Sequence, residues 1–200
     1  MSYLEKIQRL YRITAAPQIS EFTHDLGTDK GNRDMFEYLS GLRSDLLYDL
    51  GAGVELRRYD TVIALLTPSS VDYAYFFRST TFRGLPALEE AYLWKDVDSD
   101  HATKRIKGER LPVYTVLEVF LALRLVFISD QKHTVEGFEW WDRLVKDKAF
   151  ARNIFVYIEN EHKALVRITK DQYPMYRKLM WGTEPKHLER RLILSKVEIP

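Results

Sequence analysis

The first quarter of the chain carries an apolar periodicity that predicts a long helix. Apolar side chains recur at three- and four-residue intervals through residues 32–50, which places them on one helical face. They are Met35, Phe36, Leu39, Leu42, Leu46, Leu47 and Leu50. Asn32 is suited to cap the start of this helix, and Gly51 to end it, because glycine readily adopts the left-handed conformation. Residues 2–14 alternate charged and apolar side chains, which predicts a first amphipathic helix.

The glycines at the end of the long segment could instead belong to a cofactor-binding loop. Residues 49–53 read Asp-Leu-Gly-Ala-Gly, which is similar to the loop that opens a nucleotide or S-adenosylmethionine pocket. Such a loop needs a strand before its glycines and a helix after them. Here we expect a helix before them, Glu55 occupies the third glycine position, and the next apolar run already begins at Thr61. We therefore interpret Gly51 as a helix stop, and we expect no cofactor.

The remaining apolar patterns predict an α+β fold. Short runs bounded by turn residues predict strands at 61–66, 71–78 and 187–199, and a hairpin of 154–158 with 163–169. Helical spacing predicts helices at 86–94, 111–129, 134–150 and 171–181, of which the second runs into a strand; residues 95–112 form a long polar loop. We expect residues 1–200 to form a single compact domain, helical in residues 1–50, with a mixed or antiparallel sheet of about five strands and about five helices.

Composition limits the classes of function. The chain has 30 Lys and Arg against 29 Asp and Glu, a net charge of +1, so only a local patch could bind nucleic acid or an anionic membrane. It has no cysteine, which excludes disulfides, thiolate metal sites and cysteine nucleophiles. The N-terminus lacks the apolar core of a signal peptide, so we expect a cytoplasmic protein or a virion component. Glu118 and Arg124 interrupt the most apolar run, so we expect no membrane insertion.

Three short motifs resemble those of the mono-ADP-ribosyltransferases. They are Phe-Arg-Gly at 82–84, Phe-Ile-Ser at 127–129 and Glu-Asn-Glu at 159–161, in the family's order of Arg, Ser-Thr-Ser and Glu-x-Glu. The resemblance implies that Arg83 holds the phosphates of NAD and that Ser129 supports its nicotinamide end. It also implies that Glu161 stabilises the ribosyl cation, with Glu159 as the accessory carboxylate. A degenerate enzyme of this kind, using NAD, is one alternative function.

A second enzymatic alternative resembles the PD-(D/E)xK nucleases. Glu161 is followed two residues later by Lys163, and Asp142 or Asp147 lies upstream. The resemblance implies that the acids hold magnesium and that the lysine polarises the attacking water. The chain's five histidines show no metal-ligand spacing, so outside this resemblance we expect no metal site.

Two groups of basic residues are candidates for nucleic-acid contact. Lys104, Arg105, Lys107 and Arg110 lie in the polar loop, with Tyr92 and Trp94 upstream as possible stacking platforms. Arg190 and Arg191 belong to a second basic group near the C-terminus. Nucleic-acid binding is the minority alternative, because acidic residues surround the first group.

The aromatic content favours a role in binding another protein. Phe, Tyr and Trp make up 13% of the chain, and such side chains are enriched at interfaces. The candidate interface residues are Trp94, Trp140, Tyr173 and Trp181. Since no coherent catalytic set is evident, we expect a non-catalytic interaction or assembly subunit, of the kind found among phage, viral or bacterial accessory proteins. Its partner would be another protein or a second copy of the chain.

Overall fold

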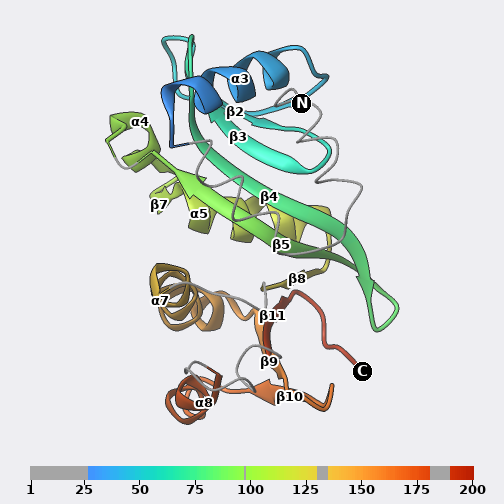
Figure 1. Ribbon diagram of the computed structural model, residues 1–200. Coiled ribbons are helices and arrows are strands. Elements are labelled where there is room, and N and C mark those ends of the chain that lie inside the picture. Colours follow the sequence, from blue (N-terminus) through green and yellow to red (C-terminus); the bar gives the residue numbers. More distant parts are fainter. Residues whose placement is uncertain (1–26, 97, 130–134, 181–189) are drawn as a thin grey trace. The chain divides into compact units, whose positions relative to one another are not determined.

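The computed structural model describes residues 27–96, 98–129, 135–180 and 190–200 (Figure 1). The helix expected at residues 2–14 lies outside them. The chain divides into two compact units, each of which includes part of strands β4 and β5. The first unit is Met1–Phe77 with Ala91–Pro112, and the second is Arg78–Glu90 with Val113–Pro200. The expectation of a single domain stays a prediction.

The predicted sheet of about five strands is wrong. Among the described residues nine strands are hydrogen-bonded in the order β1-β2-β3-β4-β5-β8-β11-β9-β10, and β6 and β7 form a separate two-stranded sheet. The nine-stranded sheet is mixed, because β8 runs parallel to β5 and antiparallel to β11. Helices and strands occur together along the chain. The number of strands exceeds the expectation because β1, β2 and β5 lie where no strand was expected: β1 and β5 in segments with helical spacing, and β2 in the stretch after Gly51.

The elements of the first unit begin with one helix and an antiparallel meander. Helix α3 starts after Thr28, whose hydroxyl accepts a hydrogen bond from the backbone N–H of Gly31, and ends at Gly41. The elements are α3 (Asp29–Ser40), β1 (Asp45–Asp49), β2 (Glu55–Arg58), β3 (Val62–Leu66), β4 (Val71–Phe82), β5 (Leu85–Lys95), α4 (Asp100–Thr103), β6 (Arg105–Ile106) and β7 (Glu109–Arg110).

Asn32 was expected to cap α3, but it lies inside the helix and joins it to the sheet. Its side-chain amide donates to the carbonyl oxygen of Val71 at 2.7 Å. Its side-chain oxygen accepts from the backbone N–H of Val71 at 2.9 Å. Both hydrogen-bonding groups of one backbone residue at the start of β4 are therefore satisfied by one side chain of the helix.

Residues 45–58 form a hairpin, so the predicted helix through Leu50 is wrong. Gly51 and Gly53 have positive φ angles of 83° and 74° and make the turn between β1 and β2. The helical spacing of Leu46 and Leu50 was misleading because Leu46 does not face a core: its side chain is 51% exposed. The glycines are preceded by a strand and followed by a second strand rather than by the helix of a phosphate-binding loop.

Helix α3 covers one face of the meander (Figure 1). Met35 and Leu39 are fully buried there, against a group of sheet side chains that point to the same face. That group is Tyr59, Val62, Ala64, Leu66, Val71, Ala74 and Phe76. The three- and four-residue spacing of the helix thus meets the two-residue spacing of the strands, which builds the core of the first unit.

The second unit confirms most elements expected in its sequence. The helix and strand at 111–129, the helix after residue 134, the hairpin near Glu159 and the last strand are all present. The helix expected at 86–94 is wrong, since this segment is part of β5. Beyond β5 the elements are α5 (Leu111–Tyr114), the π-helical segment η2 (Thr115–Phe120), α6 (Leu121–Leu123), β8 (Val126–Ile128), α7 (Val135–Leu144), η3 (Val145–Ala149), η4 (Phe150–Arg152), β9 (Phe155–Glu159), β10 (Leu165–Ile168), α8 (Tyr173–Met180) and β11 (Arg191–Ser195).

Different groups of side chains are buried on the two faces of the second unit's strands. One face carries a cluster of buried side chains: Ala87, Val126, Ile128, Tyr157, Ile193 and Ile199. On this face the hydroxyl of Tyr157 accepts a hydrogen bond from the backbone N–H of Ile199 at 2.9 Å. On the other face Phe127 stacks on Trp141, with ring centroids 5.4 Å apart. Trp141 is fully buried and donates through its indole N–H to Glu90 at 2.7 Å.

Candidate functional site

The densest group of ionisable side chains lies on one face of the second unit's sheet. Its members, which we call the Glu89–Glu159 network, are Arg78, Glu89, Glu159, Lys163 and Arg191. Arg191 lies directly opposite Glu159 in the β11–β9 ladder, and Glu89 opposite Ile128 in the β5–β8 ladder. Because Ile128 is opposite Ile193, two residues after Arg191, all three side chains lie on the same face.

Each carboxylate of this network lies between two cations. Glu89 contacts Arg191 at 3.2 Å and Arg78 at 3.3 Å. Glu159 contacts Lys163 at 3.7 Å and Arg191 at 3.9 Å. The carboxylates are the least exposed members, at 18% and 9% of their side-chain surface. The pairing compensates the cost of removing the two carboxylates from water. Sequence reasoning missed Arg78 and Glu89, because only the strand pairing brings them to Arg191.

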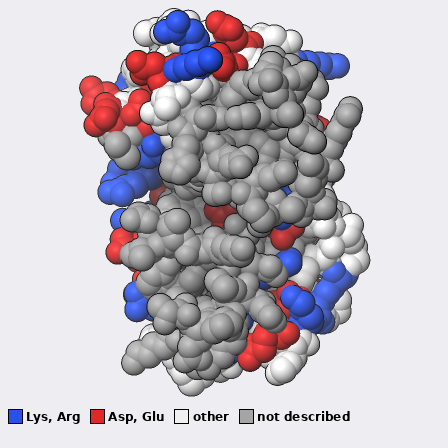
Figure 2. Space-filling model, in the orientation of Figure 1, with Lys and Arg blue, Asp and Glu red and all other residues white. Residues whose placement is uncertain are grey.

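The basic residues expected to contact nucleic acid fall into two different settings. Lys104, Arg105, Lys107 and Arg110 are all exposed, on the small hairpin β6–β7 and next to it. In Figure 2 the Lys and Arg side chains around α4 and β7 lie at the left of the view, beside a group of acidic side chains. Arg190 and Arg191, in contrast, are engaged by Glu161 and by the Glu89–Glu159 network.

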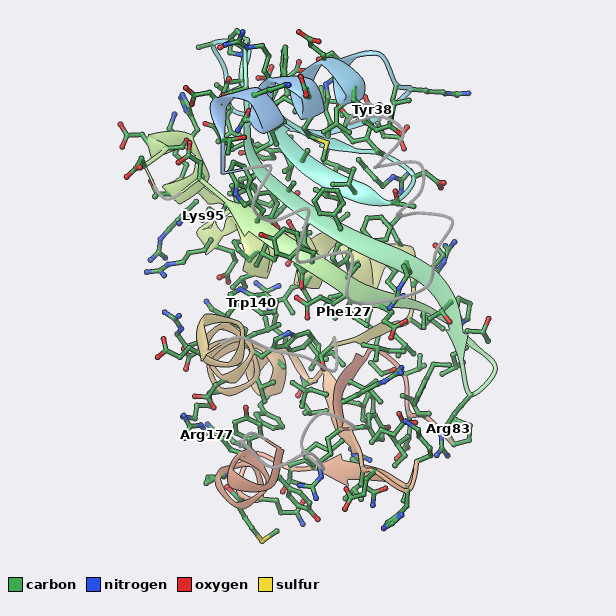
Figure 3. The ribbon with its side chains drawn as sticks, in the orientation of Figure 1. Tyr38, Arg83, Lys95, Phe127, Trp140 and Arg177 are labelled. Carbon is green, nitrogen blue, oxygen red and sulfur yellow. The ribbon has the colours of Figure 1, made fainter. Side chains whose placement is uncertain are left out.

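The four residues of the ADP-ribosyltransferase resemblance do not meet in a common arrangement. Arg83 lies in the β4–β5 turn, where its guanidinium donates to the carbonyl oxygens of Lys163 at 3.2 Å and Pro200 at 3.4 Å (Figure 3). Glu159 also contacts Lys163, through the ammonium group. Ser129 follows Ile128 and therefore lies on the opposite face of the sheet from Glu159. Its buried hydroxyl accepts a hydrogen bond from the backbone N–H of Leu192 at 2.9 Å.

Glu161 is held by an arginine from the neighbouring chain segment. Arg190 donates to its two carboxylate oxygens at 2.8 and 3.1 Å, a bidentate pairing. These hydrogen bonds are the main cause that lowers the pKa of Glu161 to about 2. Glu161 is therefore ionised at neutral pH, and both of its oxygens have a partner.

The residues of the nuclease resemblance also lie in separate contacts. Asp142, on α7, accepts from Arg177 at 2.7 Å and from the hydroxyl of Tyr173 at 3.2 Å, and it pairs with Lys146 at 3.0 Å. Burial, and next the charge of Asp142, raise the pKa of Tyr173. Asp147 is exposed. Across the part of the chain that the structure describes, no group of three or more His, Asp or Glu side chains has the geometry to hold a metal ion.

The aromatic interface candidates are largely part of the core. Tyr173 is 1% exposed, and Trp140 is half-buried with its ring edge-on to Trp141 at 5.1 Å (Figure 3). Trp94 is half-buried against the core of the first unit, and Trp181 lies outside the described residues. Within the described residues, the large apolar side chains that are exposed are not aromatic; they are Leu42, Leu46, Leu125 and Met175. Sequence reasoning missed them because Leu42 and Leu46 were assigned to a buried helical face.

Comparison of the chain with protein-family models, with curated proteins and with solved structures finds no match. None of the helices in the described ranges has both the length and the apolar character needed to cross a membrane. The function must therefore be argued from the arrangement of side chains given above.

Proposed function

We propose that this chain is a non-catalytic interaction module, an accessory factor or subunit of a larger assembly, and that it contacts its partner through strand β1. The observation that supports the proposal is an edge strand with an exposed apolar side chain. Among the strands of the described residues β1 is terminal, with β2 as its strand neighbour, and Leu46 near its start is 51% exposed. Leu42, four residues earlier, is 41% exposed.

An edge strand offers backbone hydrogen-bonding groups as well as side chains. Its outward N–H and C=O groups have no strand neighbour, so an extended segment of another chain can add to the sheet. Exposed aliphatic side chains beside such an edge contribute apolar area to the same contact. The combination at β1 is the basis for a strand-addition interface.

The charges of β1 favour a different protein over a second copy of this chain. Asp45 and Asp49 stand at the two ends of the strand. Antiparallel pairing of β1 with itself would place the Asp45 of one copy near the Asp49 of the other, and opposed like charges are destabilising. Asp45 already pairs with Arg58 across the β1–β2 hairpin, so we expect the partner to supply an extended segment with an apolar centre and a Lys or Arg opposite Asp49.

The contacts of the candidate catalytic residues also support a non-catalytic role. Ser129, Glu161 and Asp142 each make internal hydrogen bonds that join separate segments of the second unit. Each of these side chains therefore has a structural partner within the unit. These side chains are accounted for by the stability of the fold.

Peptide display against the full chain tests this proposal. Peptides selected from a random library should bind the wild type with an extended consensus of the expected charge pattern, and Leu46→Lys should weaken their binding at least roughly tenfold. Met175→Lys is the matched control, because Met175 is equally exposed at 56% but lies on α8. Selected peptides that bind Leu46→Lys as well as the wild type would overturn the assignment to β1. If light scattering shows that the wild type is a dimer and that Leu46→Lys is a monomer, the partner at β1 is a second copy of this chain and not a different protein.

A further inference from the structure

The small hairpin β6–β7 places two arginines directly opposite each other. Arg105 pairs with Arg110 and Ile106 pairs with Glu109 in its two-rung ladder. Directly opposed side chains of an antiparallel pair have Cβ atoms about 5 Å apart, and like charges there are destabilising. The turn of the hairpin is Lys107-Gly108, with positive φ angles of 50° and 81°. A lysine therefore occupies a backbone conformation that favours glycine or asparagine.

The hairpin and the short helix α4 before it are held by buried side chains and by a hydrogen bond to β4. Ile106 and Leu111 are 0% and 1% exposed, and Ala102 on α4 is 3% exposed. The hydroxyl of Ser99 accepts hydrogen bonds from the backbone N–H groups of His101 and Ala102 and donates to buried Asp72. Because Ile106 points into the core, Arg105 and Arg110 lie on the outer face of the ladder. This anchor fixes the backbone of the ladder, so the Cβ atoms of the two arginines stay opposed.

The cations of the hairpin are not neutralised within the described part of the chain. Lys104, Arg105, Lys107 and Arg110 are exposed and form no ion pair there. The polar contact of this group is between the Arg105 guanidinium and the carbonyl oxygen of Gly108, at 3.1 Å. We propose that this surface, the β6–β7 basic hairpin, binds the phosphodiester backbone of double-stranded nucleic acid, independently of base sequence. An anion between the two arginines relieves their repulsion and accepts hydrogen bonds from both guanidinium groups.

The chemistry around the hairpin favours nucleic acid over a lipid surface. The exposed large apolar side chains of the described residues are Leu42, Leu46, Leu125 and Met175, and none of them lies in the basic hairpin. Basic residues alone are attracted to an anionic membrane, but without apolar side chains that enter the bilayer interface the binding lacks the contribution of buried apolar area. Asp98 and Asp100, exposed beside the hairpin, would repel a broad anionic surface, whereas a single phosphate strand can pass next to them.

The same surroundings favour a duplex over a single strand. Binding of single strands relies on aromatic side chains that stack on bases. Residues 98–112 contain no Phe, Tyr or Trp. Of the aromatic residues that flank this segment, Tyr114 is 6% exposed, and Tyr92 and Trp94 pack against the core of the first unit, where Tyr92 stacks on Phe76 with centroids 6.1 Å apart. Burial raises the pKa of Tyr92 to about 12, in keeping with this interior position. The hairpin therefore has phosphate ligands but no base platform.

Fluorescence anisotropy of the full chain with a labelled duplex of about 20 base pairs, measured over a series of NaCl concentrations, tests the inference. Four cations on phosphates predict a slope of log K against log salt of up to about −3.6. The double variant Arg105→Ala/Arg110→Ala should reduce that slope by about 2 and weaken binding at about 0.1 M salt by more than roughly tenfold. Lys30→Ala/Arg33→Ala, which removes two exposed cations of α3, is the matched control and should leave both values unchanged.

Comparison probes decide between the possible sources of phosphate. The wild type should bind the duplex more tightly than a single strand of equal length, and more tightly than vesicles of phosphatidylserine and phosphatidylcholine. Tighter binding to the single strand or to the vesicles would overturn the inference. So would duplex binding that the double variant retains, provided that its melting curve shows it to be folded. Since the hairpin and β1 share no residue, failure here leaves the strand-addition proposal to be judged by Leu46→Lys alone.

Discussion

The two main groups of charged side chains in this protein are arranged in opposite ways. In the Glu89–Glu159 network each carboxylate has a cation on either side; Glu89 is half-buried and Glu159 is buried, while Lys163 is exposed. In the β6–β7 basic hairpin two arginines oppose each other and are exposed. The basic hairpin is one antiparallel ladder, whereas the network spans the antiparallel β11–β9 ladder and the parallel β5–β8 ladder. The two groups differ in the pairing of their charges: opposite charges lie together in the network, and like charges are opposed in the hairpin.

The comparison separates charges that support the fold from charges that remain available to a ligand. A paired and partly buried carboxylate contributes to folding, and its removal leaves an uncompensated charge. An opposed pair of like charges costs stability in the free protein and is relieved by a bound counter-ion. Substitutions in the two groups should then have opposite effects on stability.

The largest effect is expected from Arg191→Met. This substitution removes the cation shared by Glu89 and Glu159, and it should lower the free energy of unfolding by about 3 kcal/mol because two partly buried carboxylates each lose a partner. Urea denaturation followed by circular dichroism measures the change. The control Arg143→Met removes an exposed i,i+4 pair with Glu139 and should cost less than about 0.5 kcal/mol. Equal losses in the two variants would refute the structural role of the network.

A smaller loss is expected from Ser129→Ala. The variant leaves the backbone N–H of Leu192 without the acceptor it has in the wild type, at a cost of about 1–2 kcal/mol. Ser69→Ala, at an exposed turn position, should change the stability by much less. If Ser129→Ala instead kept full stability and abolished an NAD-cleaving activity of the wild type, Ser129 would be a catalytic residue and the ADP-ribosyltransferase resemblance would be functional.

In the basic hairpin, Arg105→Thr should stabilise the protein, in contrast to the two substitutions above. Removing one of two opposed arginines should raise the free energy of unfolding by about 0.5 kcal/mol at low salt. The gain should shrink as salt is added, because exposed charges are screened. Arg110→Glu, which converts the rung into an ion pair, should give a similar gain. A destabilising effect of both substitutions in low-salt urea denaturation would mean that the arginines already have a structural role.

The smallest effect concerns pH and the Glu161–Arg190 pair. Because Arg190 lowers the pKa of Glu161 from its usual 4.5 to about 2, the pair stabilises the folded state fully above pH 4.5 and loses that contribution as the pH falls to about 2. The stability difference between the wild type and Glu161→Gln should be constant above this range and shrink within it. A difference that grows on acidification would show that Glu161 is not held by Arg190.

Much of the fold could be predicted from local patterns, and the failures have a common cause. The hairpin at Glu159 and the helix leading into β8 were predicted correctly, because strand and helix there are bounded by clear turn or length signals. The segments near Leu46 and at 86–94 were assigned to helices, since apolar spacing of three or four also fits a strand with partly exposed side chains. These two segments are strands because each pairs with other strands of the sheet, and that pairing cannot be recognised from the local pattern.

The candidate sites also differ in how much of each could be predicted from the local sequence. The cations of the basic hairpin could be identified from the sequence, but not the direct opposition of Arg105 and Arg110, which depends on the register of a turn inside a segment expected to be a loop. The Glu89–Glu159 network could not be predicted at all, because its members come from β4, β5, β9 and β11 and from the turn after β9. Charge pairing across a sheet becomes visible only when the order of strands is known.

The contact between Asn32 and Val71 has a chemical consequence of its own. One carboxamide replaces, for Val71, the peptide group that an adjacent strand would supply, since its N–H donates a hydrogen bond to the Val71 oxygen and its oxygen accepts one from the Val71 N–H. An aspartate of the same size would keep the acceptor but set a second oxygen against the Val71 oxygen with no hydrogen between them. The docking of the helix on the meander therefore discriminates an amide from its hydrolysis product, which differs by a single heavy atom.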